Sequence, residues 1–229
     1  MDLTSRPFED AQAVARYAEG PPRLVPGFSD LQRMARHLIA EKVSATARLL
    51  ILGAGGGLEI QAFATAQPGW EFDGVDPSTE MLKLAATATA SFGPRVRLQQ
   101  GYIEQAPAGP FDAATCLLTL HFVPSSQRVR TLREIQQRLK PGAPLVVAHM
   151  SFPQGPGQRA EWLARYVAFG VGSGIDPVNA RRAAEKIDKE LTILTPEADE
   201  ADLRAAGFQR VDLFYTGFCF RGWVAYANS

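Results

Sequence analysis

Three glycines at alternate positions follow a short apolar run in the first quarter of the chain. Residues 49–52 predict a buried strand, Gly53, Gly55 and Gly57 come next, and a helical pattern begins at Leu58. A glycine turn between a strand and a helix exposes backbone N–H groups at the helix N-terminus, where a polar ligand can bind. The dinucleotide fingerprint G-x-G-x-x-G would need its third glycine at Leu58, so the spacing speaks against that motif.

Asp76 is the second candidate for ligand binding. It ends the run 71–75, which predicts another strand, and it follows Gly53 at close to the roughly 20-residue spacing expected of an acid that binds ribose. A carboxylate at the C-terminal end of a strand can accept hydrogen bonds from both ribose hydroxyls. The alternative is that Asp76 caps a helix that starts at Pro77. Both roles stay open, because the side chain has two oxygens.

The elements that position these residues alternate along the chain. Strands are expected at 48–52, 71–75, 96–100, 111–118 and 144–149, and helices at 58–66, 78–90 and 125–139. This alternation predicts an α/β, Rossmann-like, doubly wound sheet that is mostly parallel. Two β-rich runs after Gly207, joined by a turn at Thr216–Gly217, predict a terminal antiparallel hairpin that brings the sheet to seven strands.

Further helical segments flank this alternation. They are expected at 8–17, 28–42, 158–169, 177–191 and 196–206, with a stiff proline-rich turn between the first two. We expect residues 1–44 to form a helical lid. Residues 154–192 follow the fifth strand, so we expect this helical insertion to lie over the site. The whole chain, 1–229, is expected to be a single domain.

Composition excludes several classes of protein. The chain has 229 residues, 46% of them hydrophobic, which is enough for one sizeable core. Lys plus Arg and Asp plus Glu number 24 each, so net charge indicates neither a nucleic-acid nor a membrane partner. Cys116 and Cys219 lie in apolar runs and are expected to be buried thiols. The three histidines lack ligand spacing, so we expect no metal. The charged N-terminus lacks the apolar segment of a signal peptide, so we expect a cytoplasmic protein, and a homodimer stays open.

Five segments resemble class I S-adenosylmethionine (SAM) dependent methyltransferases. They are LGAGGG (52–57), GVDPSTEML (74–82), GYIEQAP (101–107), FDAATCLLTLHFV (111–123) and LKPGAPLVV (139–147). The resemblance implies one methyltransferase-like domain, SAM as the cofactor and methyl transfer to a small-molecule acceptor. It places the glycines under the methionine part of SAM, Asp76 on the ribose and the 103–104 pair at the adenine edge. The residues it assigns to cofactor binding are Gly53, Ala54, Gly55, Gly57, Asp76, Pro77, Met81, Ile103, Glu104, Leu117 and Leu118.

One departure and one candidate base bear on the chemistry. Relatives of this class usually carry Asp or Glu two residues before the first glycine, where this chain has Ile51, so a contact in the first loop is missing or replaced. His121, at the exit of the fourth strand, is the candidate general base for an acceptor that is protonated at neutral pH. The alternative is a partly buried histidine that hydrogen-bonds the backbone. His149, which ends the fifth strand, is a further candidate.

A narrower resemblance points to the carboxy-SAM synthase group, which converts SAM and prephenate to carboxy-SAM for tRNA wobble-uridine modification. It rests on the order of VPGFSD (25–30), LTLHFV (118–123), the helical insertion and FYTGFCFRGWVA (214–225). Phe28 and His121 depart from the Tyr and Gln of that group. Such an enzyme needs an arginine for a second carboxylate, and the insertion offers Arg165, Arg181 and Arg182. A catalytically silent SAM-binding protein is a further alternative.

Overall fold

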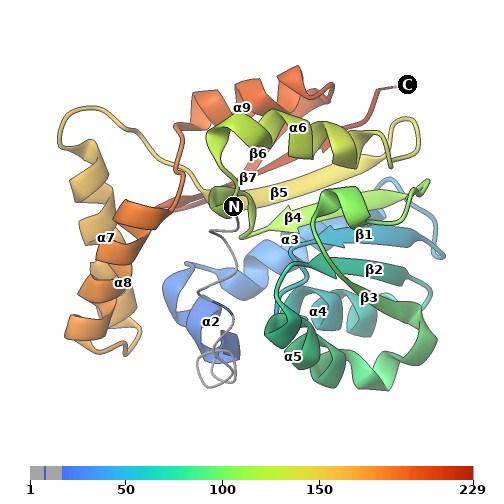
Figure 1. Cartoon of the computed structure of the whole chain (residues 1–229), viewed down its shortest axis with the longest axis horizontal. Coiled ribbons are helices and arrows are strands. Elements are labelled where there is room, and N and C mark those ends of the chain that lie inside the picture. Colours follow the sequence, from blue (N-terminus) through green and yellow to red (C-terminus); the bar gives the residue numbers. More distant parts are fainter. Residues whose placement is uncertain (1–7, 9–16, 229) are drawn as a thin grey trace.

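A seven-stranded sheet organises the computed structural model, which describes residue 8 and residues 17–228 (Figure 1). The strands are β1 Arg48–Leu52, β2 Glu71–Asp76, β3 Val96–Gln100, β4 Ala113–Leu117, β5 Pro144–Met150, β6 Gln209–Gly217 and β7 Phe220–Tyr226. Their order is β3-β2-β1-β4-β5-β7-β6. β1 to β5 are parallel, and β7 runs antiparallel to both β5 and β6. The predicted Rossmann-like sheet with its terminal hairpin is therefore confirmed.

Helices cover both faces of this sheet. The longer ones are α3 Phe28–Ala40, α4 Leu58–Ala66, α5 Thr79–Thr89, α6 Ser125–Gln136, α7 Gln158–Gly172, α8 Pro177–Glu190 and α9 Pro196–Ala205. Short ones are η2 Tyr17–Glu19, α2 Gly20–Leu24, η3 Ala90–Arg95, η4 Ile103–Gln105 and η5 Leu120–Phe122. Figure 1 shows α3, α4 and α5 on one face and α6 and α9 on the other. No helix in the described part of the chain is long and apolar enough to cross a membrane.

The buried strand β1 contributes side chains to the two hydrophobic cores, one on each face of the sheet. Its side chains alternate between the faces of the sheet, as in any strand. Leu49 and Ile51 pack into the core beneath α3 and α4, whereas Leu50 and Leu52 pack into the core beneath α6 and α9. The end of β1 is thereby fixed from both sides, and the glycine turn that follows starts from a rigid position.

Some element boundaries differ from the sequence-based expectation. β4 ends at Leu117 because Leu118 adopts a φ of 55°, which leaves the strand conformation. The hairpin turn lies at residues 218–219, not at Thr216–Gly217, which still belong to β6. The proline-rich segment expected as a stiff turn contains the short helix α2, with proline in its first turn, where the missing N–H costs nothing. Most of the helix expected at 8–17 lies outside the described residues.

The insertion between β5 and α9 lies beyond the carboxyl ends of the strands (Figure 1). Its helix α7 packs against α8 and α2. The two ends of the insertion meet at the sheet. Ser151 and Leu194 form a parallel bridge, and the N–H of Phe152 donates to the carbonyl of Leu194. Cys116 and Cys219 are buried free thiols, as predicted.

Candidate functional site

The glycine turn after β1 is a tight cradle that admits no side chain at its first position. The N–H groups of Gly53 and Ala54 both donate to the carbonyl of Val75, which folds the turn back on β2. Gly53 has a φ of 79°, and a Cβ atom there would lie 1.9 Å from the Thr119 hydroxyl. Gly55 has a φ of 49°. Glycine at both positions therefore lets the backbone itself line the site.

Asp76 connects this cradle to the end of β2. Its Oδ2 accepts a hydrogen bond from the N–H of Gly55 at 2.9 Å, and its Oδ1 accepts one from the N–H of Ser78 at 2.9 Å. Burial raises the pKa of the Asp76 carboxyl, and the two backbone N–H groups offset part of that effect. Ser78, not Asp76, is the N-cap of α5, because its hydroxyl accepts from the N–H of Met81. The ribose role and a local structural role thus meet in one side chain.

A cavity of about 510 Å³ opens beside these residues at the carboxyl edge of the sheet. It brings together nine of the predicted cofactor-binding residues: Gly53, Gly55, Asp76, Pro77, Met81, Ile103, Glu104, Leu117 and Leu118. The volume lies within the usual range for pockets that hold a small molecule or cofactor. Segments far apart in sequence, from β1, β2, η4 and β4, thus contribute to one site.

The other two predicted residues lie elsewhere. Ala54 lines a smaller pocket on the far side of the glycine turn. Gly57 lines neither pocket. It begins α4 with a φ of 80°, and a Cβ there would lie 2.9 Å from the Cα of Ala85. Its glycine is needed for the close packing of α4 on α5.

Neither candidate base lines either pocket. His121 is buried, and its Nδ1 accepts a hydrogen bond from the N–H of Met150 at 3.1 Å. Burial and the nearby His149 hold the pKa of His121 well below its usual value. This geometry matches the alternative of a histidine that bonds the backbone.

His149 belongs to a buried polar cluster on the α6 and α9 side of the sheet. Its Nε2 lies 3.1 Å from Asp199 Oδ1, although no hydrogen bond of normal geometry joins them. Arg128 forms an ion pair with the same oxygen at 2.6 Å, and both side chains are almost fully buried. Arg128 also donates to the carbonyls of Thr192 and Val123. The cluster joins α6, α9 and the end of the insertion.

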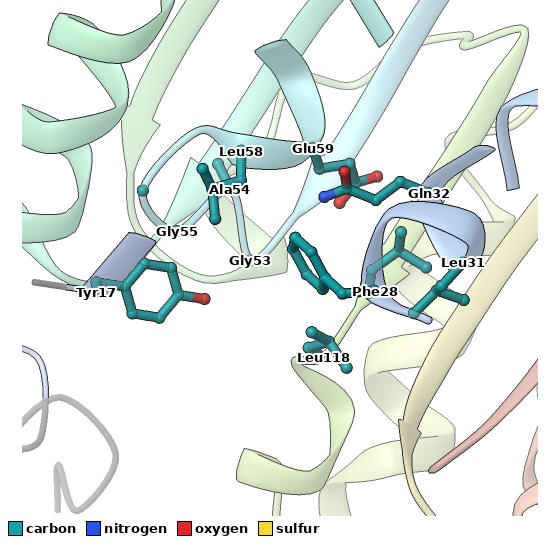
Figure 2. Close-up of a pocket in the computed structure, with 12 residues that line it drawn as sticks. Tyr17, Phe28, Leu31, Gln32, Gly53, Ala54, Gly55, Leu58, Glu59 and Leu118 are labelled. Atoms are coloured by element: carbon teal, nitrogen blue, oxygen red, sulfur yellow. The ribbon is translucent and has the colours of Figure 1, made fainter. Parts of the chain in front are cut away.

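Several pocket residues are absent from the sequence-based prediction. Among them are Phe8, Tyr17, Phe28, Gln32, Glu59, Ser78 and Thr119. Figure 2 shows Tyr17 at one end of the smaller pocket, and Gln32 and Glu59 at the other, near Phe28. A serine just before a helix is a recognisable N-cap signal, so Ser78 was open to prediction. Glu59 and Thr119 lie close to predicted residues in the sequence, whereas Phe8, Tyr17, Phe28 and Gln32 reach the site through tertiary packing.

Comparison with known proteins agrees with this architecture. A family model described as a methyltransferase domain matches residues 49–142. The carboxy-S-adenosyl-L-methionine synthase of Chromohalobacter salexigens is 24% identical over 224 residues, which cover 96% of this chain and 83% of that protein. The synthase of the same name from Methylococcus capsulatus is 26% identical over 212 residues, covering 89% of this chain and 86% of that protein.

Solved structures share the fold at lower identity. Human N-acetylserotonin methyltransferase, solved in complex with SAM, aligns with a TM-score of 0.65 at 15% identity. The alignment covers 100% of this chain and 59% of that chain. A putative O-methyltransferase from Nostoc punctiforme aligns with a TM-score of 0.63 at 18% identity, covering 98% of this chain and 69% of that chain.

Proposed function

We propose that this chain, in which residues 49–142 match a methyltransferase domain, transfers the methyl group of SAM to a small-molecule acceptor by in-line displacement. The observation that carries the proposal is the cavity in which the Gly53–Gly55 cradle and Asp76 lie together. When bound, SAM would supply a methyl group to which a nucleophile bonds as the S–CH₃ bond breaks, with S-adenosylhomocysteine (SAH) as the leaving group. The residues present fit this group, because a side chain at Gly53 would fill the cradle.

Each part of the cavity has a proposed task. Asp76 would bind the ribose hydroxyls with oxygens that the backbone already holds in place. Ile103 and Met81 would flank the adenine, and Leu117 and Leu118 would form the floor. Holding a nucleophile in line with a reactive bond can supply roughly 7–11 kcal/mol of catalysis. The domain can therefore act chiefly by positioning and by excluding water.

Apolar side chains continue the cavity beyond the residues assigned to SAM. Phe8, Phe122 and Val123 line it from the N-terminal segment and from the loop after β4. This lining favours an acceptor with an apolar body. Because His121 lines neither pocket, the proposal gives it no role in proton removal.

A carboxy-SAM synthase activity is the second candidate. It is favoured by the similarity to curated synthases along nearly the whole chain. Such an enzyme must bind the second carboxylate, yet no arginine or lysine lines either pocket among the described residues. Arg165 instead pairs with Glu161 and lies over the Trp162 ring, and Arg181 and Arg182 are exposed on α8. The pocket lining therefore favours methyl transfer.

Ligand binding and product analysis test the two candidates. SAH should raise the melting temperature and NAD should not, since a ligand at a hundred times its Kd stabilises the folded state by roughly 2.7 kcal/mol. Stabilisation by NAD alone would contradict the assignment of SAM. Incubation of the protein with SAM and a panel of small phenols, amines and carboxylic acids should yield SAH and a methylated product. Incubation with SAM and prephenate should yield no SAM species heavier by one carboxylate, and its appearance would favour the synthase.

A further inference from the structure

A second, smaller pocket adjoins the cavity at the glycine turn. Both are lined by Tyr17, Gly53, Gly55, Leu117 and Leu118, and the smaller one extends toward α3 and α4 (Figure 2). Its volume is about 30 Å³. Because one water needs about 10–15 Å³, the pocket has room for about two groups of that size. It is too small for an acceptor molecule but large enough for the polar end of a ligand.

Glu59 contributes a buried carboxyl group to this pocket. The residue is 8% exposed, and its Oε1 has no hydrogen-bond partner among the described residues. Burial raises the pKa of Glu59 to about 7, and the nearby Thr115 hydroxyl offsets part of the effect without forming a bond of normal geometry. No lysine or arginine of the described chain lines the pocket. A buried carboxylate without a counter-ion is costly, so this position suits a ligand that brings a positive charge.

Glu59 also lies close to Ile51, the residue that stands where relatives usually carry Asp or Glu. Ile51 on β1 pairs in register with Thr115 on β4, and it packs in the core beneath α3 and α4. Glu59 enters the same region from the first turn of α4, beside Thr115. A carboxyl group from the helix after the glycine turn thus lies beside the strand residue that pairs with Ile51.

We propose that Glu59 and Gln32 form the subsite for the zwitterionic amino-acid end of SAM, with Glu59 facing the ammonium and the Gln32 amide facing the carboxylate. The inference rests on the proposed function. Asp76 and Ile103 line only the larger cavity and Glu59 lines only the smaller pocket, whereas Gly53 and Gly55 of the glycine turn line both. A ligand with its ribose at Asp76 and its adenine at Ile103 extends over the turn toward the smaller pocket. Gln32 is 9% exposed there and offers an N–H donor in place of a cationic side chain.

Three ligands with an uncharged thioether sulfur separate the contributions of the two charges at the amino-acid end. SAH has both the ammonium and the carboxylate, decarboxylated SAH keeps only the ammonium, and 5′-methylthioadenosine has neither. In titration calorimetry, Glu59→Gln should weaken SAH and decarboxylated SAH by roughly 10- to 100-fold, the usual value of one charge-assisted hydrogen bond. It should leave 5′-methylthioadenosine within about twofold. Gln32→Leu should weaken SAH alone.

Other outcomes overturn the inference. Equal losses for all three ligands in Glu59→Gln would mean that Glu59 only supports the fold of the cradle, and no loss for SAH would mean that the ammonium lies elsewhere. If the variant does not fold, the wild-type protein still decides. Its preference for SAH over 5′-methylthioadenosine should rise between pH 5.5 and pH 7.5 as Glu59 ionises, and a flat preference contradicts the subsite. A wild-type protein that binds none of the three refutes the proposed function itself.

Discussion

Glu59→Gln should change how stability depends on pH. The pKa of Glu59 is raised from 4.5 to about 7, chiefly by burial. Below pH 4.5 the carboxyl is protonated in both the folded and the unfolded chain, so its ionisation does not change the unfolding free energy. Between pH 4.5 and pH 7 the unfolded chain releases the proton while the folded chain keeps it, which favours unfolding increasingly. At about 1.4 kcal/mol per pH unit, the interval from pH 4.5 to pH 7 lowers the unfolding free energy of the wild-type protein by roughly 3 kcal/mol, and the variant does not show this loss.

Urea unfolding between pH 4.5 and pH 8 measures this difference. The unfolding free energy of the wild-type protein should fall relative to that of Glu59→Gln up to about pH 7 and then run parallel to it. Tyr17 and Cys116, which interact electrostatically with Glu59, both have a pKa of about 12 and stay neutral throughout. Asp76 titrates in both proteins, so its effect cancels in the difference. The exposed Glu185 offers a control, because Glu185→Gln should leave the curve unchanged. A constant difference between wild type and Glu59→Gln would refute the reasoning.

Four further changes test other parts of the structure. Asp76→Ala should weaken SAH more than tenfold in calorimetry and lower the unfolding free energy by about 2 kcal/mol, because two backbone N–H groups lose their acceptor; unchanged stability would leave Asp76 a ligand group only. Gly53→Ala should lower the unfolding free energy by about 1–3 kcal/mol more than Gly142→Ala, because Gly142 has a similar positive φ but open space where a Cβ would lie. Equal losses in urea unfolding would exclude the steric cause. Arg128→Met should lower the unfolding free energy by about 3–5 kcal/mol, because it leaves the Asp199 carboxylate buried without its partner. The double variant with Asp199→Leu should recover most of this loss in urea unfolding, and no recovery would mean that the loss does not come from the ion pair. Amide exchange in α2 and α7 should slow when SAH binds, as a lid role for these packed helices requires, and unchanged rates would argue for a rigid pocket.

The predictable part of the site is the part that local sequence specifies. The glycines and Asp76 follow directly from the ends of two strands, so their meeting at the carboxyl edge could be predicted from the alternation of strands and helices alone. Glu59 could not. An acidic residue in the first turn of a helix is usual, because it interacts with the helix dipole, and only the packing of α3 and β4 shows that this one is buried.

Backbone geometry limited the remaining predictions. His121 follows β4 closely, as a base at the strand exit would, but the turn η5 directs its ring to the backbone of Met150. The hairpin turn includes Phe218 at a φ of 46°, a conformation that an aromatic residue rarely adopts. Nothing in the sequence marks that position as a turn, whereas Thr216–Gly217 has the composition of one.

The adjoining ends of the α7–α8 insertion fix where this part of the chain leaves and rejoins the sheet. Ser151 and Leu194 bridge where the insertion leaves and rejoins the sheet, so its entry and exit points lie side by side, and α7 and α8 pack on the core between them. The exposed connection between α7 and α8, residues 173–176, can be shortened, lengthened or replaced while the strands keep their register, because the buried side chains of the insertion lie on the helices. Neither pocket uses a residue of the insertion in its lining, so such a replacement leaves the cradle and Asp76 in place.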